Sequence, residues 1–296
     1  MRLNSSHTGA ARDLTERHHI EEQFHDARTQ RGAKPSARMD FYSSGVNDEH
    51  FRILLDAAGS LEGKRVLDFG CGLGQTSRIY AELGAARVDG FDISGENIRV
   101  AEKNAKRDRL DDRVFFRQLA AEDIDYPDES FDLVLGKAIL HHTDLEKTSK
   151  QLARVLRPGG IAYFLEPLAH NPILNLFRWL TPSRRTPTEK PLSLKDLDVF
   201  RKHFASVNYR GFYLFSLLAN GLLLVTGSRK LFNGAMKTLL QIEKPALSRF
   251  PSLQKYCWTA VLTFHKAPDP KRTWQKPTGR QVGYDKTDSH AFPGPG

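Results

Sequence analysis

The segment that most constrains the fold of this chain covers residues 66–74 and reads Val-Leu-Asp-Phe-Gly-Cys-Gly-Leu-Gly. Apolar residues that suit a buried strand lead into a turn with glycine at every second position, and a helical pattern starts near Gln75. Such a unit brings the backbone close to a ligand at the carboxyl end of a strand. Asp68 precedes the turn, where its charge would repel a pyrophosphate and would suit a ligand with a cationic amino group.

Strands and helices alternate through the central part of the chain. The expected strands cover residues 65–69, 86–91, 113–118, 131–135 and 161–165, and the expected helices cover 75–83, 96–106 and 144–156. Ser94 is the expected N-cap of the second helix, and Thr143 with Glu146 has the spacing of a capping box for the third. This alternation predicts right-handed βαβ units and a parallel sheet covered on both faces, which is a doubly wound α/β fold. Two more strands, at 205–213 and 258–264, would complete a seven-stranded sheet.

The charged residues are distributed unevenly along the 296 residues. Residues 41–175 carry 17 basic and 22 acidic side chains, whereas residues 176–296 carry 20 basic and 7 acidic ones. The basic C-terminal part favours anionic partners such as phosphate, lipid headgroups or nucleic acid. Two cysteines, Cys71 and Cys257, are too few for a disulfide framework or a Cys-x-x-Cys metal site, and the first thirty residues lack an apolar signal-peptide core. We therefore expect a reducing, cytoplasmic location.

Composition divides the chain into four parts. Residues 1–40 are expected to form a polar, loosely packed arm, 41–175 a ligand-binding core, 176–266 a substrate or lid region with the last two strands and a helical insertion, and 267–296 a disordered tail. The longest uncharged run, residues 211–227, is interrupted by an Asn-Gly pair and is shorter than the roughly 20 apolar residues of a membrane span. We interpret it as a lid, a dimer interface or a peripheral membrane contact.

Polar residues follow the carboxyl ends of the second and third strands. Asp92 lies some twenty residues beyond the glycine turn, where a carboxylate can accept hydrogen bonds from both hydroxyls of a ribose. Residues 121–123, Ala-Glu-Asp, follow the third strand and could contact the edge of an adenine. The sequence therefore predicts a nucleoside-containing ligand at this edge of the sheet.

These ordered motifs resemble those of class I S-adenosylmethionine-dependent methyltransferases, the group that includes small-molecule, quinone and sterol methyltransferases. The resemblance covers residues 46–166 and implies a Rossmann-like fold, S-adenosylmethionine as cofactor and S-adenosylhomocysteine as product. Carried over to this sequence, it assigns cofactor binding to the following residues: Tyr42, Asp68, Gly70, Cys71, Gly72, Asp92, Ile93, Ala121, Glu122, Asp123 and Lys137. The glycine turn would hold the methionine moiety, Asp92 the ribose and Ile93 the adenine, and Tyr42 would close over the cofactor.

Methyl transfer from a sulfonium chiefly requires alignment and a dry pocket, and no metal is expected. A base is needed only when the acceptor must lose a proton. The candidates are His141, His142 and Glu166, with His170 as a further one, because all lie at or just after strand ends. Lys137, a cation beside the sulfonium, is expected to point outward or to bind an anionic group of the substrate.

The region after the core suggests the kind of acceptor. Residues 214–257 stand where the family usually has a short hairpin, and their apolar residues with a basic rim suit a hydrophobic or lipid-like molecule, including one that bears an anionic group. The acceptor atom is left open among O, C and N. Two alternatives also stay open: an RNA methyltransferase, for which no appended RNA-binding fold is present, and a non-catalytic cofactor-binding protein.

Overall fold

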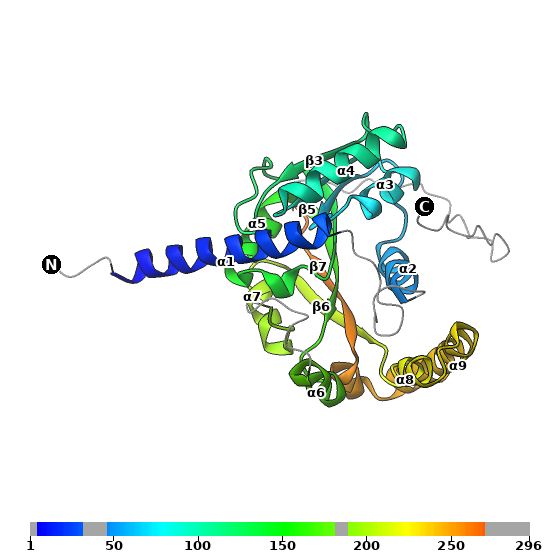
Figure 1. Ribbon diagram of the computed structural model, residues 1–296. Coiled ribbons are helices and arrows are strands. Elements are labelled where there is room, and N and C mark those ends of the chain that lie inside the picture. The colour runs from blue at the N-terminus through cyan, green and yellow to red at the C-terminus, as the bar shows by residue number, and fades with distance from the viewer. Residues whose placement is uncertain (1–4, 32–45, 181–188, 270–296) are drawn as a thin grey trace.

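The computed structural model describes residues 5–31, 46–180 and 189–269 of the chain. A seven-stranded sheet with the order β3-β2-β1-β4-β5-β7-β6 forms its centre (Figure 1). The strands are β1 Arg65–Phe69, β2 Arg87–Asp92, β3 Val114–Gln118, β4 Phe131–Lys137, β5 Leu156–Pro167, β6 Ser206–Phe212 and β7 Thr259–His265. The α-helices are α1 Ser5–Gln30, α2 Val46–Ala58, α3 Gln75–Glu82, α4 Gly95–Arg107, α5 Leu145–Val155, α6 Pro172–Leu180, α7 Leu197–Arg201, α8 Leu218–Thr226 and α9 Arg229–Arg249. Short 3₁₀ helices are η1 Leu140–His142, η3 Leu194–Asp196 and η4 Pro251–Tyr256.

The predicted seven-stranded, doubly wound α/β fold is confirmed, and the sheet is mixed rather than fully parallel. The strands β1 to β5 pair in parallel, as their uninterrupted apolar runs predict. The last strand, β7, lies between β5 and β6 and runs antiparallel to both. The handedness rule for βαβ units applies to crossovers between parallel strands. Because β7 pairs antiparallel to β6, the strand that precedes it, this rule does not apply to their connection.

Helices cover both faces of the sheet and enclose two apolar cores. One core joins α5 and α7 to the sheet through residues such as Leu152, Phe200 and Phe264, and the other joins α2 and α3 through residues such as Leu54 and Tyr80. All five of these side chains are buried. The strands are thereby fixed on both faces, and their carboxyl ends can hold a site in a constant geometry.

The helix caps follow the sequence prediction at α4 and differ from it at α5. The Ser94 hydroxyl accepts a hydrogen bond from Asn97 N, as predicted. The predicted capping box of Thr143 is wrong: Asp144 is the N-cap and accepts from Lys147 N, whereas the Thr143 hydroxyl donates to Leu140 O. The 3₁₀ turn of η1 extends through His142, so the α-helix starts one residue later than the sequence pattern indicates.

Within the N-terminal region, residues 5–30 form one long helix, α1, where the composition suggests a loosely packed arm. The C-terminal half of α1 lies along α4 at the carboxyl ends of the strands (Figure 1). Its contacts there are polar: Asp26 accepts hydrogen bonds from the Ser94 hydroxyl and from Glu96 N, and the Thr29 hydroxyl donates to Asn97. Polar side chains therefore dock this helix, which is why no apolar stripe reveals it.

The predicted helical insertion between the last two strands consists of α8 and α9. Both helices pack with α6 around a third core, which is built from Leu174, Ala219, Phe232, Met236 and Trp258. In the part of the chain that the structure describes, no helix has the length and apolar character needed to cross a bilayer.

Candidate functional site

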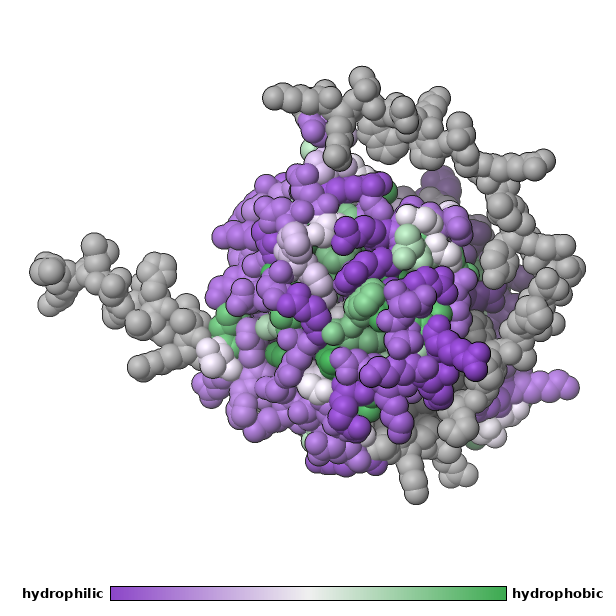
Figure 2. All heavy atoms as spheres, turned by 90° about the horizontal axis from the view of Figure 1, so that it is seen from above, coloured by the Kyte–Doolittle hydropathy of each residue, from purple (hydrophilic) through white to green (hydrophobic). Residues whose placement is uncertain are grey.

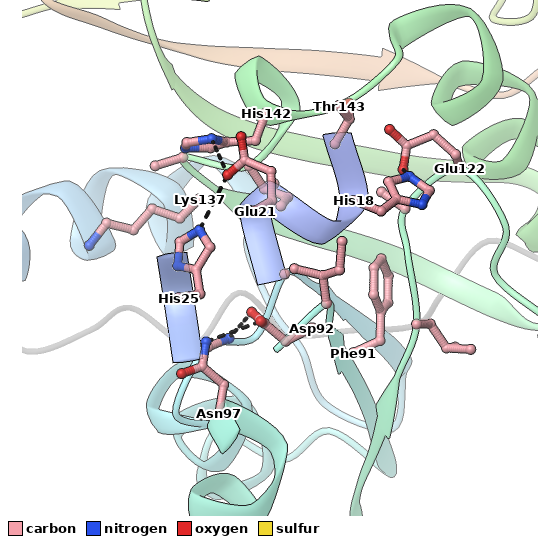
Figure 3. A pocket seen from close by; sticks show the side chains of 17 residues that line it. His18, Glu21, His25, Phe91, Asp92, Asn97, Glu122, Lys137, His142 and Thr143 are labelled. Atoms are coloured by element: carbon pink, nitrogen blue, oxygen red, sulfur yellow. Dashed lines mark hydrogen bonds and ion pairs between the residues drawn. The ribbon is translucent and has the colours of Figure 1, made fainter. Parts of the chain in front are cut away.

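A pocket lies at the carboxyl ends of β1, β2 and β4, and α1 contributes to its wall (Figure 3). It encloses about 780 Å³, its open mouth included. The residues that line it are His18, Glu21, His25, Gly70, Gly72, Phe91, Asp92, Ile93, Asn97, Leu119, Ala121, Glu122, Lys137, Ala138, Ile139, His142 and Thr143. Seven of the predicted cofactor residues are among them: Gly70, Gly72, Asp92, Ile93, Ala121, Glu122 and Lys137. Tyr42 lies outside the described residues.

The glycine turn has backbone φ angles that a residue with a side chain could adopt only with strain. Gly70, Gly72 and Gly74 all have positive φ, at 75°, 52° and 71°. A Cβ atom on Gly70 would lie 2.8 Å from Ile139, and one on Gly74 would lie 2.6 Å from the ring of Phe116. Glycine at these positions therefore leaves a backbone that a ligand can approach closely.

Asp68 and Cys71, both predicted cofactor residues, are buried and do not line the pocket. Asp68 accepts hydrogen bonds from the hydroxyls of Thr76 (2.7 Å) and Ser77 (2.5 Å) at the start of α3. Burial raises its pKa to about 6. Burial also raises the pKa of the Cys71 thiol well above its usual value, which argues against a nucleophilic role. In the described geometry Asp68 holds the glycine turn to α3.

Asp92 holds the turn and the start of α4 together at the pocket wall. One carboxylate oxygen accepts from Gly72 N at 3.0 Å, and the other accepts from Ser94 N at 2.9 Å and from Asn97 Nδ2 at 3.0 Å (Figure 3). An ionised carboxylate has about four lone-pair positions, of which these donors use three. Asp92 can therefore accept a further hydrogen bond from a ligand hydroxyl.

Glu122, rather than Asp123, faces the pocket. Glu122 is buried and accepts hydrogen bonds from the ring of His18 at 3.0 Å and from Asp144 N at 2.7 Å, whereas Asp123 is exposed and lies outside the lining. Burial alone would raise the pKa of Glu122, but the hydrogen bonds from His18 and Asp144 outweigh it, and the pKa lies below its usual value. Glu122 is thus an anion at neutral pH.

Three lining residues on α1 are absent from the sequence prediction. His18, Glu21 and His25 lie on one side of the helix and point toward the pocket (Figure 3). A Glu21 oxygen lies 3.2 Å from His142 Nδ1 and 3.8 Å from His25 Nε2. Their spacing of three and four residues is a helical signal. Because these side chains are polar, their helical spacing does not appear as an apolar periodicity in the sequence.

Two of the catalytic candidates form a buried pair behind the pocket. Glu166 is fully buried and accepts hydrogen bonds from Ile139 N and Leu140 N, both at 2.9 Å, and it lies 2.7 Å from His141 Nδ1. Neither Glu166 nor His141 lines the pocket. The geometry indicates that this pair positions the loop after β4.

His142 is the catalytic candidate that lines the pocket. Burial lowers its pKa, but the adjacent Glu21 carboxylate more than compensates and places the pKa above its usual value. His170, the further candidate, accepts a hydrogen bond from Leu194 N at 3.2 Å and lies outside the lining.

Lys137 ends β4 and contributes to the same wall. In Figure 3 its side chain extends away from Asp92 and Glu122. Burial, followed by the positive charge of Lys137, lowers the pKa of nearby His50 to about 3. The outward direction agrees with the electrostatic argument against a cation beside a sulfonium.

Three side chains near the pocket have the chemistry of metal ligands. His141, His142 and Glu189 each offer a ligand atom, and these atoms lie within 4.8 Å of one another. We refer to them as the His–Glu cluster. Two imidazoles and one carboxylate suit a divalent transition metal, so the expected metal independence of the site requires a direct test.

Comparison with known proteins identifies the central part of the chain. Residues 67–164 match the family described as methyltransferase domain. The chain is 34% identical over 163 residues to a ubiquinone biosynthesis O-methyltransferase of Rhizobium rhizogenes, covering 49% of this chain and 64% of that protein. It is 41% identical over 99 residues to 27-O-demethylrifamycin SV methyltransferase of Amycolatopsis mediterranei, covering 33% of this chain and 36% of that protein. The match spans between about a third and two thirds of these relatives.

The fold is similar to that of solved methyltransferase structures. Geranyl diphosphate C-methyltransferase from Streptomyces coelicolor superposes with a TM-score of 0.58 at 13% identity, covering 86% of this chain and 98% of that one. At this identity the similarity concerns the fold. Residues 67–164 thus match a methyltransferase domain, and the seven-stranded sheet that contains them has the fold of a solved methyltransferase.

Proposed function

We propose that the chain transfers the methyl group of S-adenosylmethionine to an oxygen, carbon or nitrogen atom of a hydrophobic or lipid-like small molecule. The observation that carries the proposal is the position of Asp92, whose carboxylate lines the pocket beside the glycine turn and keeps a free acceptor position. This is the arrangement that a ribose hydroxyl requires.

The proposed cofactor contacts follow the wall of the pocket. The backbone of Gly70 and Gly72 permits close approach of the methionine moiety, and Asp92 accepts from the ribose. Ile93 and Glu122 stand farther along the same wall, where an apolar side chain and an anionic acceptor suit the face and the amino edge of adenine. When bound, the cofactor supplies an electrophilic methyl group.

The protein contributes alignment and exclusion of water at the acceptor. Phe91, Leu119 and Ile139 give the pocket an apolar wall, and α1 covers it from one side. His142, held by Glu21, is the proposed base for acceptors that must lose a proton, and it acts in its neutral form. The name of the Rhizobium rhizogenes relative, which refers to ubiquinone biosynthesis, supports a hydrophobic acceptor.

The same proposal includes a cytoplasmic enzyme that meets its acceptor at a membrane surface. Lipid-like molecules partition into bilayers, so a peripheral contact would bring the enzyme to its substrate. A homodimer also stays a prediction.

Calorimetric titration with S-adenosylhomocysteine tests the cofactor part of the proposal. Asp92→Ala should weaken binding about tenfold or more, because it removes a charged acceptor. Asp123→Ala is the matched control, since this exposed acid lies near the pocket without lining it. Thermal unfolding of both variants checks that the fold is intact. Unchanged affinity in a folded Asp92→Ala variant, or no binding by the wild-type chain, would refute the assignment.

Radiolabelled S-adenosylmethionine tests the acceptor class. The chain is incubated with the lipid, aqueous-metabolite and RNA fractions of a host extract, and the label in each fraction is counted. We expect label in the lipid fraction. Label in RNA would replace the proposal by an RNA methyltransferase, and no label despite cofactor binding would favour a non-catalytic protein.

A further inference from the structure

Exposed apolar side chains are concentrated on the helices at one end of the molecule. Twelve of the fifteen large hydrophobic residues exposed in the described structure lie between Ile173 and Tyr256. The helices α6, α8 and α9 and the 3₁₀ helix η4 lie along the lower edge in Figure 1. Figure 2, which looks down on the opposite end, shows mostly hydrophilic residues. Surface of this kind, gathered at one end, indicates a contact with an apolar partner.

The exposed residues follow helical periodicity. On α8, Leu218, Leu222 and Val225 are exposed at spacings of four and three residues, and Val225 is 86% exposed. On α6, Ile173, Leu176 and Leu180 are exposed at spacings of three and four, next to Trp179, which is 76% exposed. Each helix thus has one apolar side toward the shared core and another toward solvent. We call the solvent side of α6, α8 and α9 the docking face.

The positive charge of the docking face is concentrated on α9, which carries five exposed lysines and arginines, whereas α8 has no charged residue. Residues 206–256 as a whole contain seven lysines and arginines and a single acid, Glu243. Glu243 is buried and contributes no charge to the surface. Its carboxylate accepts hydrogen bonds from four consecutive backbone N–H groups, of residues 213–216, and from the Ser216 hydroxyl, at 2.7 to 3.1 Å. Glu243 therefore links residues 213–216, which precede α8, to α9. The charged side chains of residues 206–256 that remain at the surface are all basic.

We propose that the docking face binds the surface of a membrane that contains anionic lipid. Exposed aliphatic residues and a tryptophan can enter the interfacial layer, while the surrounding lysines and arginines contact anionic headgroups. Charge distinguishes this partner from a second copy of the chain, because a symmetric contact would bring two positive faces together. The apolar residues distinguish it from nucleic acid, which needs basic and stacking groups but no exposed leucine or valine.

The docking face is close in sequence to the candidate site. Only four residues separate the end of β5 at Pro167 from the start of α6 at Pro172. Glu166, which holds the loop after β4, is at the end of the same strand. Membrane binding at α6 would place the site near a reservoir of lipid-like acceptor. This consequence depends on the proposed function, whereas membrane binding itself does not.

Sedimentation with lipid vesicles tests the inference without cofactor or turnover. The vesicles contain phosphatidylcholine alone or with about a third phosphatidylglycerol. We expect binding to the anionic vesicles, weakened by salt and absent from the neutral ones. The double change Lys237→Glu and Lys244→Glu should lower the vesicle partition coefficient at least about 25-fold. Each lysine near an anionic surface contributes roughly a factor of five, and the two factors multiply. Trp179→Ser with Val225→Ser, both highly exposed, should also weaken binding without unfolding the chain.

The matched control changes two exposed lysines at the other end of the molecule. Lys103→Glu with Lys106→Glu on α4 alters the net charge by the same amount and should leave vesicle binding nearly unchanged. Equal loss in this control would refute the docking face. So would equal binding to neutral vesicles, no binding to either kind, or a dimer in sedimentation velocity that the Trp179→Ser and Val225→Ser changes dissociate. Each of these results leaves the calorimetric test of cofactor binding unaffected.

Discussion

Replacing Glu166 with glutamine separates a catalytic from a positioning role for this carboxylate. Glu166 is fully buried and receives hydrogen bonds from Ile139 N and Leu140 N, and His141 Nδ1 lies 2.7 Å away. Glutamine has nearly the same shape, but it is neutral, and an NH₂ group that donates hydrogen bonds replaces one of the carboxylate oxygens. The substitution therefore changes charge and hydrogen bonding with little change in packing.

The expected loss of stability follows from these three contacts. A hydrogen bond to a charged group contributes about 1.5–3 kcal/mol and a neutral one about 0.5–1.5 kcal/mol, so three weakened bonds cost about 3 kcal/mol. The new amide NH₂ also faces at least one donor. The relieved cost of burying a charge offsets part of this loss, and we expect a net decrease in the free energy of unfolding of about 2–4 kcal/mol.

Urea unfolding and steady-state kinetics together provide the test. With a slope of about 3 kcal/mol per molar, the midpoint of urea unfolding should fall by about 1 M. The affinity for S-adenosylhomocysteine should change little, because Glu166 does not line the pocket. Glu146→Gln is the control: this exposed residue of α5 pairs with Lys202 at the surface, and its loss should leave the midpoint unchanged. An unchanged midpoint for Glu166→Gln with a loss of turnover of about 10²–10⁴-fold would refute the positioning role and indicate a catalytic base.

Three further changes test the pocket. Glu122→Gln should weaken binding of S-adenosylhomocysteine about tenfold in calorimetry, through loss of an anionic acceptor, whereas Asp123→Asn should not; equal effects would refute the choice between them. Glu21→Gln should lower the pKa of His142, because it removes the carboxylate that raises this pKa. Since the neutral form of His142 is the proposed base, the acid limb of the pH–rate profile should then move to lower pH, and an unchanged limb would exclude His142 as the base. Chelation with EDTA should leave turnover intact, and loss of activity that zinc restores would make the His–Glu cluster a metal site.

The parts of the fold and site that follow local rules could be predicted from sequence. Buried parallel strands are continuous apolar runs, and the glycine turn needs positive φ, so both leave a direct trace in the sequence. Asp92 ends a strand at a fixed distance from that turn, and the structure places it in the pocket.

Features set by contacts distant in sequence could not be predicted in this way. Glu166 lies at the end of β5 and His142 follows β4, and both side chains could act as a base, yet Glu166 is buried behind the loop and His142 lines the pocket. The packing of β5 against the loop after β4 decides this difference. The docking of α1 through Asp26 and Thr29 likewise depends on partners about 70 residues later in the chain.

The burial of Glu243 has a consequence for how the docking face would respond to conditions in the cell. Residues 206–256 contain no histidine, and their one carboxylate is inside the protein. The remaining ionisable groups of the surface are lysines, arginines and tyrosines, whose charges are constant between roughly pH 5 and 9. Acidification of a compartment would therefore not release the protein from a membrane. Its residence there would vary with ionic strength and with the fraction of acidic lipid in the bilayer, so lipid metabolism itself would control it.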